Sequence, residues 1–390
     1  MAGADTLRSL FEPFKLGTLT LRNRVVMAPM TRAFATDGVH GPAATDYYRR
    51  RAEGGVALII SEGTPPSHPT APFFRNLPNL EGNRALAAWR EISDAVKAAG
   101  SHMFIQLWHA GLLRIASDSD FPHVASIGPS GLYPHPSVQD AVRKDLKLAE
   151  RPTNGETLGG REMSIADIDA IIDAFASSAV AVQDLGFAGV ELHAAHGYLI
   201  DQFFWSVTNQ RSDKYGGGIA DRTRFAVEII QEIRRRTRPE FLISFRFSQF
   251  KPPHYDTRLF EVPSDLEAFL RPIIDAGVDV FHPSTRRFWL PEFSGSDLGL
   301  AGWTKKITGR PTIAVGSVGL SEAFDPRKGT KAESSTAGLD RLTDMMARGD
   351  FDLIAIGRSL LANPDWVRLV KEQGEAALRP FQKEAVDVLF

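Results

Sequence analysis

The chain has 390 residues, 43% of them hydrophobic, and a formal net charge of -2 at pH 7. This length allows a large buried core, and the near-neutral charge argues against nucleic acid as a partner. The chain contains no cysteine, which excludes disulfides, thiolate zinc sites and iron–sulfur clusters held by cysteine. It shows neither a signal peptide nor the ~18 consecutive apolar residues of a membrane span, so we expect a soluble, cytoplasmic protein without membrane contact.

The elements are expected to alternate along most of the chain. Residues 14–21 predict a small β-hairpin that turns at Gly17. Apolar runs without period-two alternation follow, as is typical of parallel strands covered on both faces. These eight predicted strands are 24–27, 56–61, 103–107, 189–192, 241–247, 278–281, 312–315 and 353–356.

Helical patterns lie between the strands, and the third has a near-capping box at Ser164 and Asp167 and a stop at Gly186. Eight strands alternating with helices predict an α/β fold, a single (β/α)8 TIM barrel over residues 1–390. A doubly wound sheet typically has fewer strands and a glycine-rich turn after the first. The predicted helices are 43–52, 83–99, 165–185, 221–236, 264–275, 339–347 and 365–373.

Two stretches interrupt the alternation. Residues 111–161 follow the third strand, and residues 286–306 follow the sixth. We expect long loops at the mouth of the barrel, where such loops build lids and pockets, although surface insertions without a role are an equal alternative. The polar stretch 322–335 is expected to be exposed.

The predicted fourth strand ends in His193, His196 and Tyr198, which are separated by small residues. Three hydrogen-bonding side chains with little bulk between them are delivered to one place. Two interpretations are open here: ordinary strand-end residues, or a functional site. Barrel enzymes have their active sites at the C-terminal ends of the strands, which makes the other strand ends informative.

Polar side chains and glycines recur at those ends. Gln106 can donate and accept hydrogen bonds, as an amide-edged heterocycle requires, and Arg246 is a permanent cation that could stabilise an anionic ring. A glycine followed directly by a polar residue stands after the seventh strand and again after the eighth. Barrels often bind phosphate at this place, so a phosphorylated ligand is implied. Each glycine alone could equally be a tight turn. These two pairs are Gly316 with Ser317 and Gly357 with Arg358.

Five runs at or just after the strand ends resemble the motifs of the old yellow enzyme family, the FMN-dependent ene-reductases. They are residues 27–32, 106–111, 191–199, 209–217 and 356–358. As a set these motifs are highly specific, and the resemblance covers nearly the whole chain. It implies a TIM barrel with FMN held across its mouth.

The resemblance also implies which residues contact the cofactor. The isoalloxazine would lie along the end of the first strand, with its pyrimidine edge at Gln106 and its N1 and O2 side near Arg246. The backbone at Gly63 would lie against it. The remaining implied contacts are Ala28, Pro29, Met30 and Thr31 with the ring, and Gly316, Ser317, Gly357 and Arg358 with the phosphate.

The reaction implied by the resemblance is the reduction of an activated alkene, such as an enone, enal, nitroalkene or maleimide. NADPH or NADH would reduce FMN, which would pass hydride to the β-carbon. His193 and His196 would hydrogen-bond the substrate oxygen, and Tyr198 would protonate the α-carbon. Reductant and substrate would use one site in turn, which predicts ping-pong kinetics. The oligomeric state is left open, a homo-oligomer included.

The sequence departs from classical members of that family in one respect. Its last tyrosine is Tyr255, so nothing after Arg358 supplies the tyrosine that often lines the substrate pocket. We hypothesise that Trp108, Phe288 and Trp289 shape the pocket instead.

Two other functions are considered. Glu191, His193 and His196 could bind a metal ion in a barrel hydrolase, since Glu191 and His193 share one face of a strand. No further His, Asp or Glu stands at the end of the first, fifth or eighth strand, so we expect no metal. The other alternative, a flavin-binding protein without turnover, does not explain the intact histidine and tyrosine set.

Overall fold

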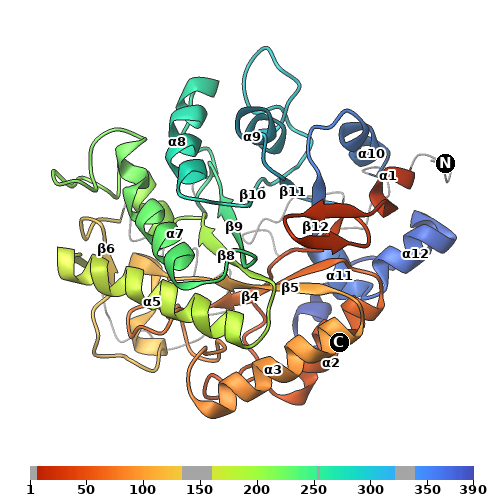
Figure 1. Cartoon of the computed structure of the whole chain (residues 1–390), viewed down its shortest axis with the longest axis horizontal. Coiled ribbons are helices and arrows are strands. Elements are labelled where there is room, and N and C mark those ends of the chain that lie inside the picture. The colour runs from red at the N-terminus through yellow and green to blue at the C-terminus, as the bar shows by residue number, and fades with distance from the viewer. Residues whose placement is uncertain (1–6, 134–159, 253–254, 321–338) are drawn as a thin grey trace.

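The computed structural model describes residues 7–133, 160–252, 255–320 and 339–390. Eight parallel strands form a barrel in the order β10-β9-β8-β5-β4-β3-β12-β11, and parallel bridges from Phe281 to Thr312 and from Ser284 to Val315 join its two edges (Figure 1). All eight predicted strands and the TIM barrel are confirmed. The strands are β3 (Val25–Met27), β4 (Leu58–Thr64), β5 (His102–Leu107), β8 (Gly189–Ala194), β9 (Leu242–Phe247), β10 (Val280–Pro283), β11 (Ile313–Val315) and β12 (Leu353–Ile356).

Helices surround the strands, and all seven predicted helices are confirmed within three residues at either end (Figure 1). The predicted cap is present: the Ser164 side chain accepts the Asp167 N–H, and the Asp167 carboxylate accepts the Ser164 N–H. The helices are α1 (Arg8–Phe11), α2 (Pro42–Glu53), α3 (Asn83–Ala98), α5 (Ile165–Asp184), α6 (Leu199–Phe204), α7 (Arg224–Arg236), α8 (Pro263–Asp275), α9 (Leu300–Thr308), α10 (Leu339–Ala347), α11 (Arg358–Ala362) and α12 (Trp366–Gln373).

The predicted loop 286–306 is wrong in its last part, because α9 begins at Leu300. A glycine inside a short helix weakens the sequence signal. Glycine at position 302 allows close packing against Leu298, because a Cβ at this position would lie 2.9 Å from the Leu298 side chain. A long loop after β10 remains, from residue 284 to residue 299.

Part of the other predicted loop is also described. It contains two single-turn 3-10 helices, Gly111–Leu113 and Ala116–Asp118, and a short strand β6 (Ile127–Gly128) that pairs with β7 (Arg161–Glu162). Residues 134–159 of this loop, and the stretch 322–335 expected to be exposed, lie outside the described residues.

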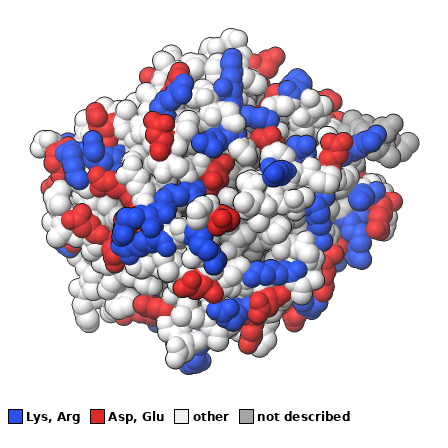
Figure 2. Space-filling view, viewed as in Figure 1, with Lys and Arg blue, Asp and Glu red and all other residues white. Residues whose placement is uncertain are grey.

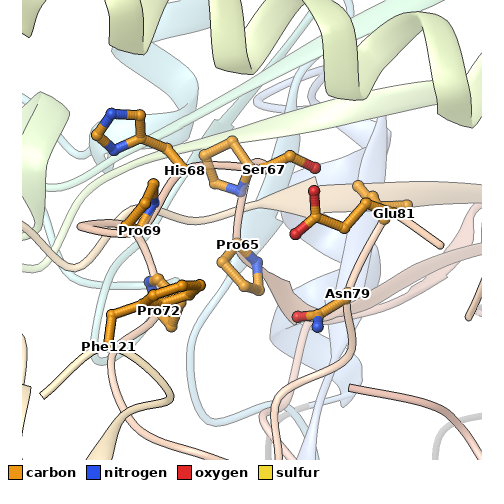
Figure 3. Close-up of a pocket in the computed structure, with 10 residues that line it drawn as sticks. Pro65, Ser67, His68, Pro69, Pro72, Asn79, Glu81 and Phe121 are labelled. Carbon is orange, nitrogen blue, oxygen red and sulfur yellow. The ribbon is translucent and has the colours of Figure 1, made fainter. Parts of the chain in front are cut away.

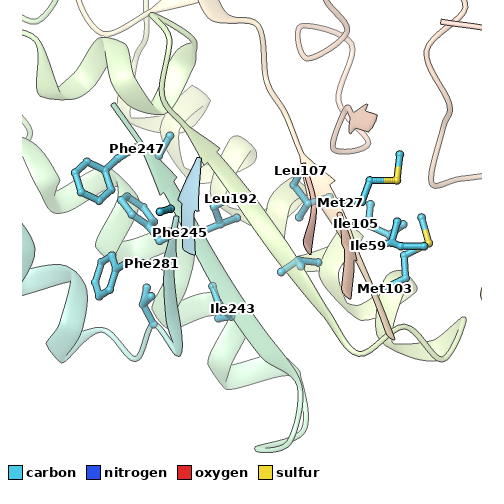
Figure 4. Packing of buried hydrophobic residues seen from close by; sticks show 14 of the residues in the cluster. Met27, Ile59, Met103, Ile105, Leu107, Leu192, Ile243, Phe245, Phe247 and Phe281 are labelled. Atoms are coloured by element: carbon cyan, nitrogen blue, oxygen red, sulfur yellow. The ribbon is translucent and has the colours of Figure 1, made fainter. Parts of the chain in front are cut away.

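The core has two layers. Outward-facing strand residues pack beneath the helices, including Met27, Ile59, Met103, Ile105, Leu107, Leu192, Ile243, Phe245, Phe247 and Phe281 (Figure 4). A second cluster fills the barrel interior and includes Leu16 and Leu21 of the predicted hairpin, β1 (Phe14–Leu16) and β2 (Leu19–Leu21). Gly17, at φ +56°, lies against the side chain of Leu242 at the start of β9. The hairpin therefore plugs the N-terminal end of the barrel and leaves the other end for a site.

The surface in Figure 2 mixes positive and negative side chains. Arginines of α7 carry much of the positive charge near their helix, and carboxylates neutralise them: Arg234 pairs with Asp279, and Arg236 pairs with Asp173 at 2.6 Å. No described helix is long and apolar enough to cross a membrane.

Candidate active site

A cavity of about 450 Å³ opens at the C-terminal ends of the strands. A smaller one of about 170 Å³ adjoins it and shares Pro29, Thr31, His196, Tyr198 and Arg246 with it. Most of the predicted site residues line one or both. They are Ala28, Pro29, Met30, Thr31, Gln106, Trp108, His193, His196, Tyr198, Arg246, Gly316, Ser317, Gly357 and Arg358.

Strand register assembles a layer of buried polar side chains behind Gln106, which lines the smaller cavity, and we call this layer the floor of the site. Gln106 on β5, Glu191 on β8 and Ser244 on β9 are direct partners across the three strands. Inward-facing residues recur every second position, so these three side chains meet inside the barrel. The Glu191 carboxylate accepts hydrogen bonds from Gln106 Nε2 at 2.9 Å and Ser244 Oγ at 2.9 Å, and it lies 2.7 Å from His282 Nδ1 on β10.

Glu191 is fully buried, yet it is held in its ionised form. Burial raises the pKa of Glu191, but His282, Arg246 and Ser244 together outweigh burial, so that its pKa lies below the ordinary value. Arg246 Nη1 is 3.9 Å from Glu191 Oε1. A carboxylate only accepts, so Gln106 must turn its amide nitrogen toward Glu191 and leave its carbonyl oxygen for a ligand.

The rim of the site is the strand-to-helix turn after β8. His193, on β8, lies with its ring 5.0 Å from the His196 ring and 4.9 Å from the Tyr198 ring. The Trp108 ring is 4.9 Å from Tyr198. His196 Nε2 is 2.9 Å from Ser284 Oγ, which orients the imidazole. The structure therefore brings together all three predicted catalytic residues.

Both histidines are neutral near pH 7. Burial, the other histidine and Arg246 lower the pKa of His193 well below 6.5, and burial and Arg246 do the same for His196. A neutral imidazole carries one N–H donor, and it gives up that proton far less readily than an imidazolium. The pair can therefore polarise an oxygen without acting as the proton source.

The residues present fit an FMN. Arg246 Nε and Nη1 and His193 Nδ1 are buried and lack a hydrogen-bond partner among the described residues, as expected of donors and acceptors that face a ligand. The larger cavity is lined by polar side chains such as Thr31, Arg246 and Ser284 and by many apolar ones, a mixture that suits a ring system with one polar and one methylated edge. The apolar side chains include Met30, Val318, Leu320, Leu361, Phe381 and Val386.

The predicted phosphate end is also present. Gly316 and Ser317 follow β11, and Gly357 and Arg358 follow β12, all of them on the larger cavity. Gly316 has φ +139°, and a Cβ there would lie 2.5 Å from the Thr285 carbonyl oxygen, so only glycine fits. Burial lowers the pKa of Arg358 to about 10, which still leaves a cation at neutral pH.

Three predicted residues take other places. Gly63 lies beneath Trp108, where a Cβ would be 2.4 Å from the indole. Phe288 and Trp289 line neither cavity. Phe288 is 3% exposed and packs on Phe351 in the core, while its backbone N–H donates to the Gly316 carbonyl oxygen. In the described residues, the structure does not bring these two aromatic side chains to the pocket.

Sequence reasoning missed several residues around the site. His282 could have been found, because it follows the inward-facing Val280 by two positions on β10. Phe250, whose ring is 5.2 Å from His196, had no comparable signal. The sequence likewise gave no signal for Phe381 and Val386, which line the cavity from the C-terminal segment of the chain.

The metal interpretation is not favoured. The Glu191 carboxylate already faces four protein groups. Within the described ranges, no group of three or more His, Asp or Glu side chains is placed to share a metal ion.

A separate pocket of about 180 Å³ lies in the loop after β4 and is lined by none of the predicted site residues (Figure 3). His68 on its wall bonds Thr70, whose hydroxyl is 3.0 Å from His109 Nε2. His109 therefore turns away from the active-site cavity, although Trp108 before it faces that cavity.

Comparison with known proteins decides the family. Residues 9–325 match the profile of the NADH:flavin oxidoreductase / NADH oxidase family. The chain belongs to this family. The match confirms the old yellow enzyme resemblance, the class of flavin oxidoreductase and FMN as the cofactor.

Similar proteins include two enzymes of different length. The chain is 32% identical over 361 residues to 12-oxophytodienoate reductase 1 of Oryza sativa subsp. japonica, covering 92% of this chain and 85% of the relative. It is 32% identical over 382 residues to an NADH oxidase of Thermoanaerobacter brockii, but spans only 52% of that relative. A structure of morphinone reductase in complex with tetrahydroNAD superposes with a TM-score of 0.76 at 26% identity, covering 97% of this chain and 94% of that one.

Proposed function

We propose that the protein is an NAD(P)H-dependent ene-reductase, which adds hydrogen across the C=C bond of an activated alkene such as an enone, enal, nitroalkene or maleimide. One observation carries this proposal: two neutral imidazoles and a phenol converge, with ring separations of 5.0 and 4.9 Å, on the smaller cavity, which adjoins the larger one that fits FMN. The tetrahydroNAD in the morphinone reductase structure supports a nicotinamide as reductant.

The cofactor would be held by Thr31, Gln106 and Arg246 at its ring and by the glycine pairs after β11 and β12 at its phosphate. Bound FMN supplies the hydride, which it has received from NADPH or NADH. The protein's contribution is to hold both partners in one dry cavity and to stabilise the charge that develops on the substrate.

His193 and His196 would donate N–H groups to the substrate oxygen, where negative charge accumulates. Removal of one such donor typically raises the barrier by ~2.7–4 kcal/mol. Tyr198 would donate its phenolic proton to the α-carbon, and solvent would return that proton. A placed proton donor contributes roughly 10²–10⁴-fold in rate.

An absorption experiment tests the proposal. The purified protein should be yellow, should bleach with NADPH or NADH under anaerobic conditions, and should recover its colour with 2-cyclohexenone. A colourless protein that also fails to bind added FMN would contradict the proposal. A yellow protein that does not regain its colour when the alkene is added would favour the flavin-binding protein without turnover.

The role of Tyr198 is tested by Tyr198→Phe. It should slow alkene reduction by roughly 10²–10⁴-fold and leave FMN affinity unchanged. Tyr215→Phe is the matched control, since that phenol donates to Glu228 at 2.7 Å and lines neither cavity.

The order of binding is a separate test on the wild-type enzyme. Initial rates should follow a ping-pong pattern, and a sequential pattern would contradict the use of one cavity by both substrates.

A further inference from the structure

The turn that carries His196 and Tyr198 has an uncommon backbone. His196 has φ +63° and Gly197 has φ +81°, so two consecutive residues are left-handed. For a residue other than glycine this conformation is disfavoured by about 1–3 kcal/mol and persists only where its surroundings impose it. Something in the structure must therefore hold this turn.

Two side chains anchor it through backbone N–H groups, and a third, Gln202, donates from Nε2 to the Gly197 carbonyl oxygen at 2.8 Å. Ser248 Oγ accepts the His196 N–H at 3.1 Å, and Asp201 Oδ2 accepts the Gly197 N–H at 2.7 Å. Ser248 is itself fixed, since its hydroxyl donates to the Phe250 carbonyl oxygen at 2.7 Å. The two anchors act on neighbouring peptide groups, so together they set the path of the chain between the two side chains.

Asp201 is in turn fixed by Lys251. The Lys251 ammonium lies 2.6 and 2.7 Å from the two Asp201 carboxylate oxygens, and both side chains are fully buried. The Trp205 ring is 5.8 Å from the ammonium and helps to exclude water. A buried ion pair is weak evidence for stability, because desolvation offsets much of the attraction between the charges. Stability alone therefore does not explain why Lys251 and Asp201 form a buried ion pair here.

We propose that Lys251 and Ser248, three residues apart on the segment after β9, are positioning residues for the reaction. Lys251 acts through Asp201, and Ser248 acts directly, so that the left-handed turn keeps His196 and Tyr198 at their working separation. This rests on the function proposed above for His196 and Tyr198. Rotation of the Gly197 peptide would move one of these side chains relative to the other.

Lys251→Met tests the inference, because it keeps the unbranched chain as far as Cε and removes the charged ammonium. The rate of alkene reduction from pre-reduced enzyme should fall by about 10–100-fold, the effect expected of small misplacements. The solvent isotope effect should rise as proton donation slows, and FMN affinity should stay within about threefold. Lys305→Met is the matched control, since Lys305 pairs with Asp352 at 2.8 Å at the opposite end of the barrel.

A background variant separates positioning from a general loss of structure. In His196→Ala/Tyr198→Phe, Lys251→Met should slow the reaction by less than about twofold, because its effect acts through the two missing groups. The same loss in this background, or no loss in the wild-type background, would overturn the inference. If His196→Ala/Tyr198→Phe is itself as fast as wild type, the proposed function has failed, which is a different result.

Ser248→Ala covers the case in which Lys251→Met does not fold. It removes the other anchor without stranding a buried charge. The expected result is the same pattern with a smaller loss of rate, again absent in the His196→Ala/Tyr198→Phe background. An unchanged rate and isotope effect in Ser248→Ala would count against the inference.

Discussion

The floor and the rim of the site are built in different ways. The floor consists of side chains from the interior of strands, in which Gln106, Ser244 and His282 surround the Glu191 carboxylate. The rim is the His196–Tyr198 turn, which is held through backbone N–H groups by residues of a loop and a short helix. Each part contains one buried carboxylate, but Glu191 orients side chains and Asp201 orients backbone.

This difference separates what the fold fixes from what can vary. The floor follows from register: as long as β5, β8 and β9 pair as they do, Gln106, Glu191 and Ser244 must meet. The rim depends on the paths of connecting segments, which tolerate change far better than strands do. Contacts with the flavin ring at Gln106 and Arg246 should therefore be robust to changes in the loop after β9, and substrate range should be sensitive to them.

The largest expected effect comes from breaking the floor. Glu191→Ala leaves Arg246 and His282 buried without their carboxylate, which should destabilise the protein by about 3–5 kcal/mol and reduce the FMN content. Urea unfolding and flavin absorbance measure the two effects. Glu267→Ala is the control, because Glu267 pairs at 2.7 Å with Arg271 and both side chains are exposed. A loss below about 1 kcal/mol for Glu191→Ala would show that the floor contributes little.

The fold and the floor were largely predictable from sequence. Apolar runs gave the eight strands, and the strand ends gave Gln106 and Arg246, because both features depend on local pattern. Glu191 was noticed only in the metal-binding alternative, which was not favoured. Its actual partners, Ser244 and His282, are polar residues in apolar strands and become visible only when the two-residue period is extended across neighbouring strands.

The rim was predictable only in part. The motif gave His193, His196 and Tyr198, but nothing local links Asp201 with Lys251, which are fifty positions apart. The path of each connecting segment decides such pairs, and it depends on tertiary packing. The same reason explains why Phe288 was predicted in the pocket and lies in the core.

A smaller effect is expected at Glu62, a third buried carboxylate, which, like Asp201, accepts hydrogen bonds from backbone N–H groups. Glu62, at the end of β4, accepts the N–H groups of Arg32 and Ala33 at 2.9 Å each. Burial raises the pKa of Glu62 from 4.5 to about 7, although these hydrogen bonds and Arg32 oppose the shift. Between these two values the native state holds more protons than the unfolded state, so stability falls as pH rises, by about 3 kcal/mol in total.

Glu62→Gln measures this contribution. Because other groups also titrate, the informative quantity is the difference between wild type and variant in the free energy of unfolding at pH 4, 6 and 8. The wild type should lose about 3 kcal/mol relative to Glu62→Gln between the lowest and the highest pH. Parallel pH dependences would show that the pKa of Glu62 is the same in the native and unfolded states, and would contradict the shift.

The smallest expected effect concerns the charge on the rim. Burial and Arg246 keep the pKa values of His193 and His196 well below 6.5, so both are neutral N–H donors above that pH. The rate of alkene reduction from pre-reduced enzyme should therefore change by less than about twofold between pH 6.5 and 8. An imidazolium donor would instead lose about tenfold per pH unit above its pKa. His196→Asn, which carries an N–H donor that does not titrate, should show the same flat profile, and a slope in wild type that this variant abolishes would show that His196 acts as a cation.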